Sequence, residues 1–173
     1  MIELQQLTSE HLEWARQLHN DPEVLAMLTD PHVVDYYEQC GWFSNLCDST
    51  TSKRLLVMLD NVPIGLVRLD QIDIHNNSVC VGLDIHKDFR GKGHARTIYN
   101  LVLEEYFEQR QFNRVWLMVA DYNERAKHLY ETLGFVLEGI QRQALFKNGQ
   151  YFDYLSMSIL KSEWSKTCLI FSK

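Results

Sequence analysis

The stretch that most constrains this sequence is Asp88–Ala95, a glycine-rich turn between two regular segments. A strand-like run, Val79–Ile85, precedes it, and a helix-like run over 94–108 follows it. Gly91 and Gly93 permit positive φ and let a ligand approach the backbone closely. The first N–H groups of the following helix have no intrahelical partner, and the helix dipole is positive there. The turn therefore predicts a phosphate-binding loop at a helix N-terminus.

Other kinds of turn compete with this interpretation. A Walker loop requires Ser or Thr directly after its glycine-lysine pair. Here Gly93 follows the pair Gly91-Lys92, and neither Ser nor Thr follows Gly93. The dinucleotide fingerprint requires a third glycine, and Arg96 stands in its place. A plain surface turn, whose glycines only end and begin the neighbouring elements, is also compatible with so short a pattern. The pattern that remains is Arg90-x-x-Gly93-x-Ala95, with positive charge from Arg90 and Lys92.

The rest of the chain alternates strand-like and helix-like segments. Asp21 is expected to cap a short helix that has Pro22 at its first position, and Asn148-Gly149 is a strong hairpin signal. Arg114–Ala120 is apolar on both faces, so we expect it in the middle of the sheet. The order predicts an α/β fold with a mixed, mostly antiparallel sheet, a parallel central pair and helices on both faces. The expected strands are 2–7, 54–59, 64–69, 78–85, 114–120, 135–146 and 150–159. A first helix is expected to begin at Thr8, and further helices are expected over 22–27, 33–46, 94–108 and 123–133.

Three local expectations accompany this order. Thr8 or Ser9 is expected to cap the first helix, and Asp60–Pro63 is expected to form a hairpin turn because of its residue types. The segment 33–46 carries interleaved aromatic residues that either pack in the ordinary way or form one wall of a substrate cleft. These residues are Tyr36, Tyr37, Trp42 and Phe43.

Length and composition place the chain in a broad class. Its 173 residues, 46% of them hydrophobic, suit a single domain spanning 1–173. No apolar run approaches the roughly 18 residues of a membrane span, and Met1–Leu4 lacks a signal-peptide pattern. We therefore expect a cytoplasmic protein that makes no membrane contact. The net charge of −6 argues against a general nucleic-acid binder, which is more often basic.

The four cysteines indicate neither a zinc site nor a disulfide framework. They are Cys40, Cys47, Cys80 and Cys168, and no two of them form a C-x-x-C pair. Free thiols are the expected state in a reducing compartment. We therefore expect no metal in this protein.

Several stretches resemble one enzyme family, and together they cover nearly the whole chain. Arg90-x-x-Gly93-x-Ala95 resembles the acetyl-CoA pyrophosphate loop of the GNAT N-acetyltransferases, and Asn123–Phe135 resembles their N-x-x-A-x-x-x-Y-x-x-x-G-F signature. Softer matches are similar to the branch that holds ribosomal-protein N-terminal acetyltransferases and spermidine N-acetyltransferases. These are Asn20–Val24, Glu138-Gly139, Asn148–Tyr151 and Met157.

The resemblance implies a site for acetyl-CoA as co-substrate, between strands 78–85 and 114–120 that splay apart. It implies that backbone groups of Leu83, Asp84 and Ile85 bond the pantetheine arm, and that Asn123 helps to fix the cofactor near the thioester. It also implies that backbone N–H groups hold the pyrophosphate. These belong to Arg90, Gly91, Lys92, Gly93, His94 and Ala95.

Tyr130 matches the family's tyrosine general acid, which would protonate the departing thiolate. The alternative is a core tyrosine, because Tyr130 shares an apolar stripe with Ala126 and Leu133. The general base stays open. Relatives often carry a carboxylate near position 80, where this chain has Cys80, a weak candidate for an acyl-carrying nucleophile. Asp70, Asp84 and His86 are further candidates for the base.

The resemblance implies an N-acetyltransferase that moves acetyl from acetyl-CoA to a small-molecule or peptide primary amine. The acidic chain and Gln150-Tyr151 favour a polyamine such as spermidine. A protein N-terminus and an amino-sugar nucleotide stay open as acceptors, and so does a non-catalytic acyl-CoA-binding module. A polyamine would need carboxylates in its cleft, for which the candidates are Asp30, Asp35, Glu38 and Asp70. A homo-oligomer is compatible with the sequence.

Overall fold

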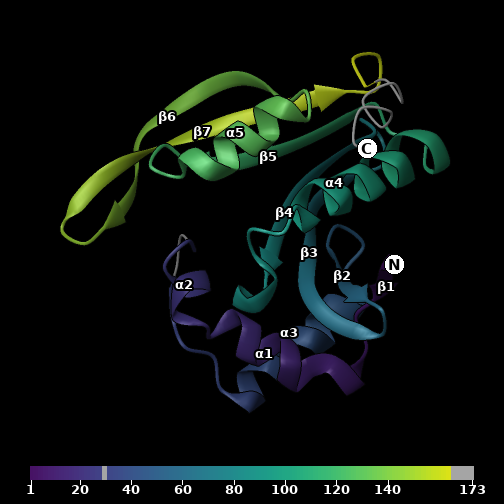
Figure 1. Ribbon diagram of the computed structural model, residues 1–173, viewed down its shortest axis with the longest axis vertical. Helices are drawn as coiled ribbons and strands as arrows, with labels where there is room; N and C mark the ends of the chain where they lie inside the picture. The colour runs from purple at the N-terminus through teal and green to yellow at the C-terminus, as the bar shows by residue number, and fades with distance from the viewer. Residues whose placement is uncertain (29–30, 165–173) are drawn as a thin grey trace. The chain divides into compact units, whose positions relative to one another are not determined.

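The computed structural model describes residues 1–28 and 31–164, which form the helices and strands of Figure 1. Asp30, one of the expected acceptor residues, and Cys168 lie outside the described residues. The strands are β1 (Ile2–Gln6), β2 (Lys53–Leu59), β3 (Val62–Asp73), β4 (Ser78–Ile85), β5 (Arg114–Ala120), β6 (Val136–Lys147) and β7 (Gln150–Leu160). The helical elements are η1 (Ser9–His11), α1 (Leu12–His19), α2 (Pro22–Leu25), α3 (Tyr36–Asp48), η2 (Lys87–Phe89), α4 (His94–Glu104), the π-helical η3 (Glu105–Gln109) and α5 (Glu124–Thr132).

The sheet has the strand order β1-β2-β3-β4-β5-β7-β6. The pairs β1–β2, β2–β3, β5–β7 and β6–β7 are antiparallel. Pairing between β4 and β5 is parallel and joins Ser78–Cys80 to Arg114–Trp116. This confirms the expected α/β fold with a mostly antiparallel sheet and a parallel central pair. It also confirms the central place of β5, which lies between β4 and β7.

The chain divides into two compact units. Unit 1 comprises Met1–Ile72 and Val81–Leu101, and unit 2 comprises Asp73–Cys80 and the chain from Val102 onward. Strand β4 contributes its first three residues to unit 2 and the others to unit 1. That the whole of 1–173 acts as one acetyltransferase domain stays a prediction.

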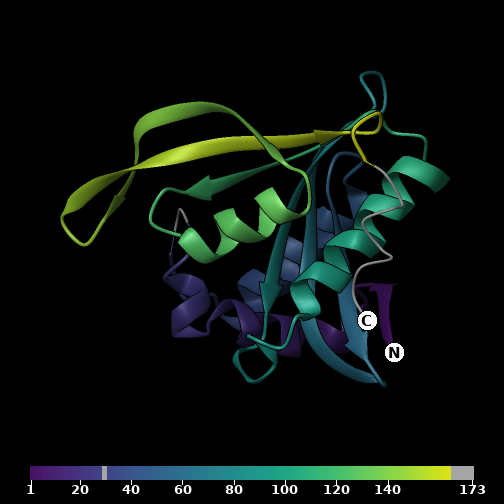
Figure 2. The ribbon, with the colours of Figure 1, turned by 45° about the horizontal axis from the view of Figure 1, so that its top comes forward.

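Unit 1 is built on both faces of its strands. Leu12, Ala15 and Leu18 of α1 form a buried cluster with β2 and β3, against which Trp42 and Phe43 of α3 also pack. Side chains alternate along a strand, and Val57, next to the clustered Leu56, is also fully buried. The opposite face is therefore covered too. Figure 2 shows α4 in front of β3 and β4, with α1 behind them.

Unit 2 has its own core around β5. Alternate residues of β5 are buried, and so are residues of η3, of β7 and of the segment that follows α5. The π-helical turn places Tyr106 and Phe107 inside, where Tyr106 meets the ring of Phe112 edge to face at 5.0 Å between centroids. The buried set of unit 2 includes Val102, Leu103, Val115, Leu117, Val119, Leu133, Phe135, Met157 and Ile159.

Local departures from the sequence expectations have identifiable causes. Helix α3 begins at Tyr36 rather than at 33, because Asp35 caps it and forms a capping box with Glu38. Thr8 occupies the cap position of η1, as expected for Thr8 or Ser9, but its side chain makes no capping hydrogen bond. The turn after β2 is shorter than expected. Asp60 and Asn61 both take positive φ, so Val62 already belongs to β3.

Strands β6 and β7 form a long hairpin whose tip projects beyond α5 (Figure 2). The tip is Asn148-Gly149, with φ of 50° and 82°, as the sequence signal predicts. The guanidinium of Arg114, the first residue of β5, donates two hydrogen bonds to the Glu138 carboxylate on β6, one of them 2.6 Å long. These hydrogen bonds hold the pKa of Glu138 below its usual range.

This depressed pKa predicts an acid-sensitive contribution of Glu138 to stability. The contribution is present above the pKa of the unfolded chain and is lost as pH falls through the lower pKa of the folded protein. We expect Glu138→Gln to lower the melting temperature at pH 7, and the difference from the wild type to shrink as the pH is lowered towards 3. Melting curves of both proteins across that range measure it. A difference that stays constant with pH would contradict the assignment.

Candidate functional site

The glycine-rich turn forms a tight loop between β4 and α4. The side chain of His86 caps the short helix η2, accepting from the backbone N–H of Asp88 at 3.4 Å. Gly91 and Gly93 follow with φ of 78° and 83°, a conformation that glycine adopts without strain. Helix α4 then begins at His94. The loop therefore has the strand, double left-handed turn and helix N-terminus on which the sequence prediction depends.

The space beside Gly93 is open. A Cβ atom built on Gly93 would meet no heavy atom within 4 Å, and residues 91–93 are exposed. An anion can therefore approach the backbone here and accept from N–H groups at the start of α4. Lys92 extends over the ring of Phe89, with its Nζ 5.4 Å from the ring centroid. The open space and the N–H groups at the start of α4 are thus compatible with the predicted phosphate-binding loop.

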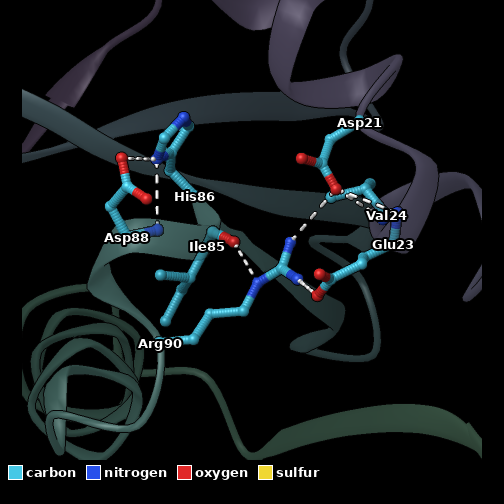
Figure 3. A network of polar contacts seen from close by, with 7 residues as sticks. All are labelled: Asp21, Glu23, Val24, Ile85, His86, Asp88 and Arg90. Carbon is cyan, nitrogen blue, oxygen red and sulfur yellow. Dashed lines mark hydrogen bonds and ion pairs between the residues drawn. The ribbon is translucent and has the colours of Figure 1, made fainter.

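The side chain of Arg90 turns away from this open space. Its Nε donates to the carbonyl oxygen of Ile85 at 2.7 Å, and its Nη1 bonds the carboxylate of Glu23. Its Nη2 lies 3.8 Å from Oδ1 of Asp21. Figure 3 shows the guanidinium between these three groups. The positive charge of Arg90 is therefore largely balanced by two carboxylates, which leaves Lys92 as the other cation of the loop.

The end of β4 is held firmly against β3. The His86 N–H donates to the carbonyl of Ile64 at 2.8 Å, and a Cβ on Gly65 would come within 2.7 Å of the Asp84 carbonyl oxygen. The Asp84 carboxylate forms an ion pair with Nε of Arg68 at 3.2 Å. Gly65 therefore allows a close approach of the two backbones. Asp84 is engaged in an ion pair rather than displayed as an isolated base.

The second group of predicted site residues lies on α5 in unit 2. Asn123 caps this helix, its Oδ1 accepting from the Ala126 N–H at 3.2 Å. Tyr130 is half-buried, with its ring 5.8 Å from that of Phe135. The apolar stripe predicted with Tyr130 is only partly buried, since Leu133 lies inside while Ala126 is half-exposed. Tyr130 therefore lies at the margin of the core, which suits either assignment made from the sequence.

Sequence reasoning missed Asp121, which directly follows β5. Its backbone N–H donates to the carbonyl of Asp153 at 3.1 Å, and its own carbonyl accepts from Lys127 Nζ at 3.0 Å. Its Oδ1 is buried and has no hydrogen-bond partner among the described residues. Such an oxygen requires a hydrogen bond from a water molecule or a ligand, or a proton of its own. An acidic residue directly after an apolar strand was the available signal.

The expected acceptor carboxylates are engaged in local structure. Asp35 and Glu38 accept from each other's backbone N–H groups at 2.9 Å in the capping box of α3. Asp70 on β3 pairs with Nη1 of Arg54 at 2.8 Å.

The aromatic residues of helix α3 differ in their exposure. Tyr37 is exposed, whereas Trp42 and Phe43 pack against the unit 1 core. Packing thus accounts for Trp42 and Phe43, and a role in a cleft stays open for Tyr36 and Tyr37.

Apart from Asp70 on β3 and Asp30, which lies outside the described residues, the predicted site residues fall into three groups. One is the end of β4 with the glycine loop, and another is the start of α3, both in unit 1. The third is α5 with Asn123 and Tyr130, in unit 2. Among the described residues, no group of three or more His, Cys, Asp or Glu side chains could hold a metal ion. No helix in the described ranges is long and apolar enough to cross a membrane.

Comparison with known proteins gives one consistent result. Residues 22–135 match the model of the acetyltransferase (GNAT) family. The chain is 26% identical to spermidine N(1)-acetyltransferase of Escherichia coli (strain K12) over 163 residues, which cover 94% of this chain and 88% of that protein. It is 40% identical to the Vibrio cholerae spermidine N(1)-acetyltransferase over 101 residues, 58% of each chain. The crystal structure of the Vibrio cholerae enzyme in complex with CoA and spermine matches with a TM-score of 0.88 at 30% identity, covering 94% of this chain and 96% of that one.

The open space at Gly93 generates a prediction for cofactor affinity. Gly93→Glu should raise the Kd for acetyl-CoA at least about tenfold, because a bulky anion would fill the space proposed for a phosphate. Gly149→Glu is the matched control, since Gly149 has φ of 82° and equally open surroundings at the hairpin tip. Calorimetric titration measures both. Unchanged affinity in a folded Gly93→Glu protein would remove the loop from the cofactor site.

Proposed function

Since the chain belongs to the acetyltransferase (GNAT) family, with residues 22–135 matching its model, we propose that it acetylates a polyamine. The chain is an acetyl-CoA-dependent N-acetyltransferase that transfers the acetyl group to an amine. The observation that carries the polyamine proposal is the similarity, over nearly the whole chain, to an enzyme solved with CoA and spermine. The net charge of −6 agrees with a cationic acceptor.

The family resemblance supports a proposal for each cofactor contact. Backbone N–H groups from Arg90 to Ala95 would hold the pyrophosphate, and backbone groups of 83–85 would bond the pantetheine arm. Since the Ile85 carbonyl already accepts from Arg90 at 2.7 Å and the Asp84 carbonyl faces Gly65 of β3, Leu83 is the first proposed partner for this arm. Asn123, fixed as the cap of α5, would contact the cofactor near its thioester.

Tyr130 is proposed as the general acid. Acetyl-CoA supplies an acetyl thioester whose carbonyl carbon accepts a neutral amine and whose sulfur leaves as a thiolate. The phenol of Tyr130 would donate its proton to that sulfur, which makes it a better leaving group. Because side chains on a helix lean towards its N-terminus, the Tyr130 hydroxyl would extend back towards the Asn123 end of α5.

The base that deprotonates the ammonium stays open, and the structure adds a candidate. Asp70 and Asp84 form ion pairs with arginines, and His86 lies 3.7 Å from an Asp88 carboxylate oxygen. Asp121 has a buried carboxylate oxygen with no hydrogen-bond partner among the residues described. An ammonium or an ordered water would satisfy that oxygen, so Asp121 joins the earlier candidates, Cys80 included.

The acid assignment predicts a specific loss in Tyr130→Phe. This change removes one hydroxyl and keeps the ring, so kcat should fall by about 10²–10⁴-fold while acetyl-CoA affinity and melting temperature change little. Tyr106→Phe is the control, because Tyr106 is a buried tyrosine that packs on Phe112. Initial rates at saturating acetyl-CoA, with melting curves alongside, measure both. A folded Tyr130→Phe variant with nearly full kcat would contradict the general-acid assignment and favour a core role for Tyr130.

The polyamine assignment predicts an electrostatic contribution to acceptor binding. Asp35→Asn with Glu38→Gln removes two charges from the start of α3 yet leaves the capping acceptors, since both replacements are good capping residues. KM for spermidine should rise, and its dependence on salt should weaken. Steady-state rates at low and high ionic strength measure this, with the melting temperature reporting that the cap is intact.

Rates measured with a panel of acceptor amines separate the alternative substrates. If neither the two charge changes nor added salt altered the turnover of spermidine, these two carboxylates would not be the groups that bind the acceptor. Turnover of peptide N-termini or amino-sugar nucleotides without spermidine would replace the polyamine. Tight acetyl-CoA binding with no thiol release for any amine would identify a non-catalytic acyl-CoA-binding module.

A further inference from the structure

We propose that Arg90 is a positioning residue, which couples the acetyl-CoA loop to the segment that carries the acceptor carboxylates. It does so through the carboxylates of Asp21 and Glu23, which belong to the N-terminal turn of α2. The proposal rests on the proposed function, because it takes acetyl-CoA as the ligand of the loop. Every residue in it lies in unit 1.

One guanidinium serves both sides of this connection. Its Nε closes the loop onto β4 by donating to the Ile85 carbonyl at 2.7 Å, while both Nη atoms face α2 (Figure 3). The Arg90 side chain is 23% exposed and that of Asp21 is 12% exposed, so the pair of Arg90 with Asp21 is largely withdrawn from solvent, whereas Glu23 is 69% exposed. Partial burial strengthens a charged contact and reduces its screening by salt.

Asp21 links the guanidinium to the core of unit 1. Its Oδ1, the oxygen that faces Arg90, also accepts from the backbone N–H of Glu23 at 2.9 Å and of Val24 at 3.3 Å. Val24 is buried in the cluster formed by α1, β2 and β3. A shift of Arg90 would therefore disturb the cap of α2, whose position is fixed by the packing of Val24.

The neighbouring residue Asn20 continues the connection in the other direction. Its side-chain amide donates to the Val34 carbonyl at 2.8 Å, and its Oδ1 accepts from the Val34 N–H at 2.9 Å. Val34 directly precedes Asp35, which caps α3 and pairs with Glu38. A continuous series of contacts thus joins Arg90 to the two carboxylates proposed for the acceptor.

The balance of charge separates positioning from direct phosphate binding. If the guanidinium bound phosphate as a cation, Lys at position 90 would largely replace it, and loss of the Glu23 anion would favour the cofactor. We call the contacts of Arg90 with Ile85, Glu23 and Asp21 the clasp. They need the planar fork of arginine, which donates to Ile85 and Glu23 while lying 3.8 Å from Asp21 and which lysine does not reproduce. The two accounts therefore predict opposite signs for Glu23 and different outcomes for Lys.

The first experiment compares cofactor affinity in folded variants. Under the clasp, Glu23→Ala raises the Kd for acetyl-CoA about fivefold or more, and Arg90→Lys weakens binding about as much as Arg90→Gln. Because Arg90→Gln already breaks the clasp, adding Glu23→Ala to it should have little further effect. Glu10→Ala, which removes an exposed carboxylate from the same unit, is the control for net charge and should leave Kd unchanged. Unchanged or tighter binding in Glu23→Ala, or near wild-type binding in Arg90→Lys, would overturn the proposal.

Hydrogen exchange distinguishes failure of the clasp from failure of the cofactor site. Acetyl-CoA should slow amide exchange over 90–96 and also over 22–26 and 34–38, where the Glu23, Val24 and Val34 N–H groups report on the connection. In Glu23→Ala, protection should persist in the loop and be lost in the two distant segments. Wild-type protection confined to the loop would refute the coupling alone. Absence of protection over 90–96 would instead refute the cofactor site.

Discussion

Strand β4 is the element on which both units depend. Its first three residues pair in parallel with β5 in unit 2, and its last residue leads into the glycine loop of unit 1. Parallel pairing covers Ser78–Cys80 only, while β4 continues to Ile85. The strand therefore has five residues beyond the pairing with β5. In the proposed function, backbone groups at its end, over 83–85, bond the pantetheine arm.

The net charge of the chain does not show which of its carboxylates are paired. Carboxylates that the composition counts as negative surface are engaged in specific contacts in unit 1. Asp21 and Glu23 hold Arg90, Asp84 pairs with Arg68, and Asp70 pairs with Arg54. The net charge of −6 already counts these arginines and does not locate the remaining carboxylates, so it supports a cationic acceptor only weakly. The similarity to an enzyme solved with spermine carries more weight.

Patterns contained within a few residues predicted most of the fold. The bounds of β4 and β5 agree with the structure at both ends, because turn residues flank short apolar runs. Asp21 was correctly expected to cap α2, with Pro22 at its first position. The change from α4 to the π-helical η3 was not predicted, since an apolar stripe of helical spacing continues through Tyr106. The family and the acetyl transfer to an amine followed from the loop and the Asn123–Phe135 signature, and both are confirmed.

The sequence by itself determined the loop conformation, the helix caps and the family, because each depends on residues close together in the chain. Gly93 takes positive φ for a local steric reason, and Asn123 caps α5 through an N–H three residues away. The tertiary structure alone decided what Arg90 does. Its partner Glu23 is 67 positions away in the sequence, and no local pattern encodes which charged groups packing brings together. The same holds for Asp121, since only the arrangement of neighbouring atoms shows that its buried oxygen has no donor among the described residues.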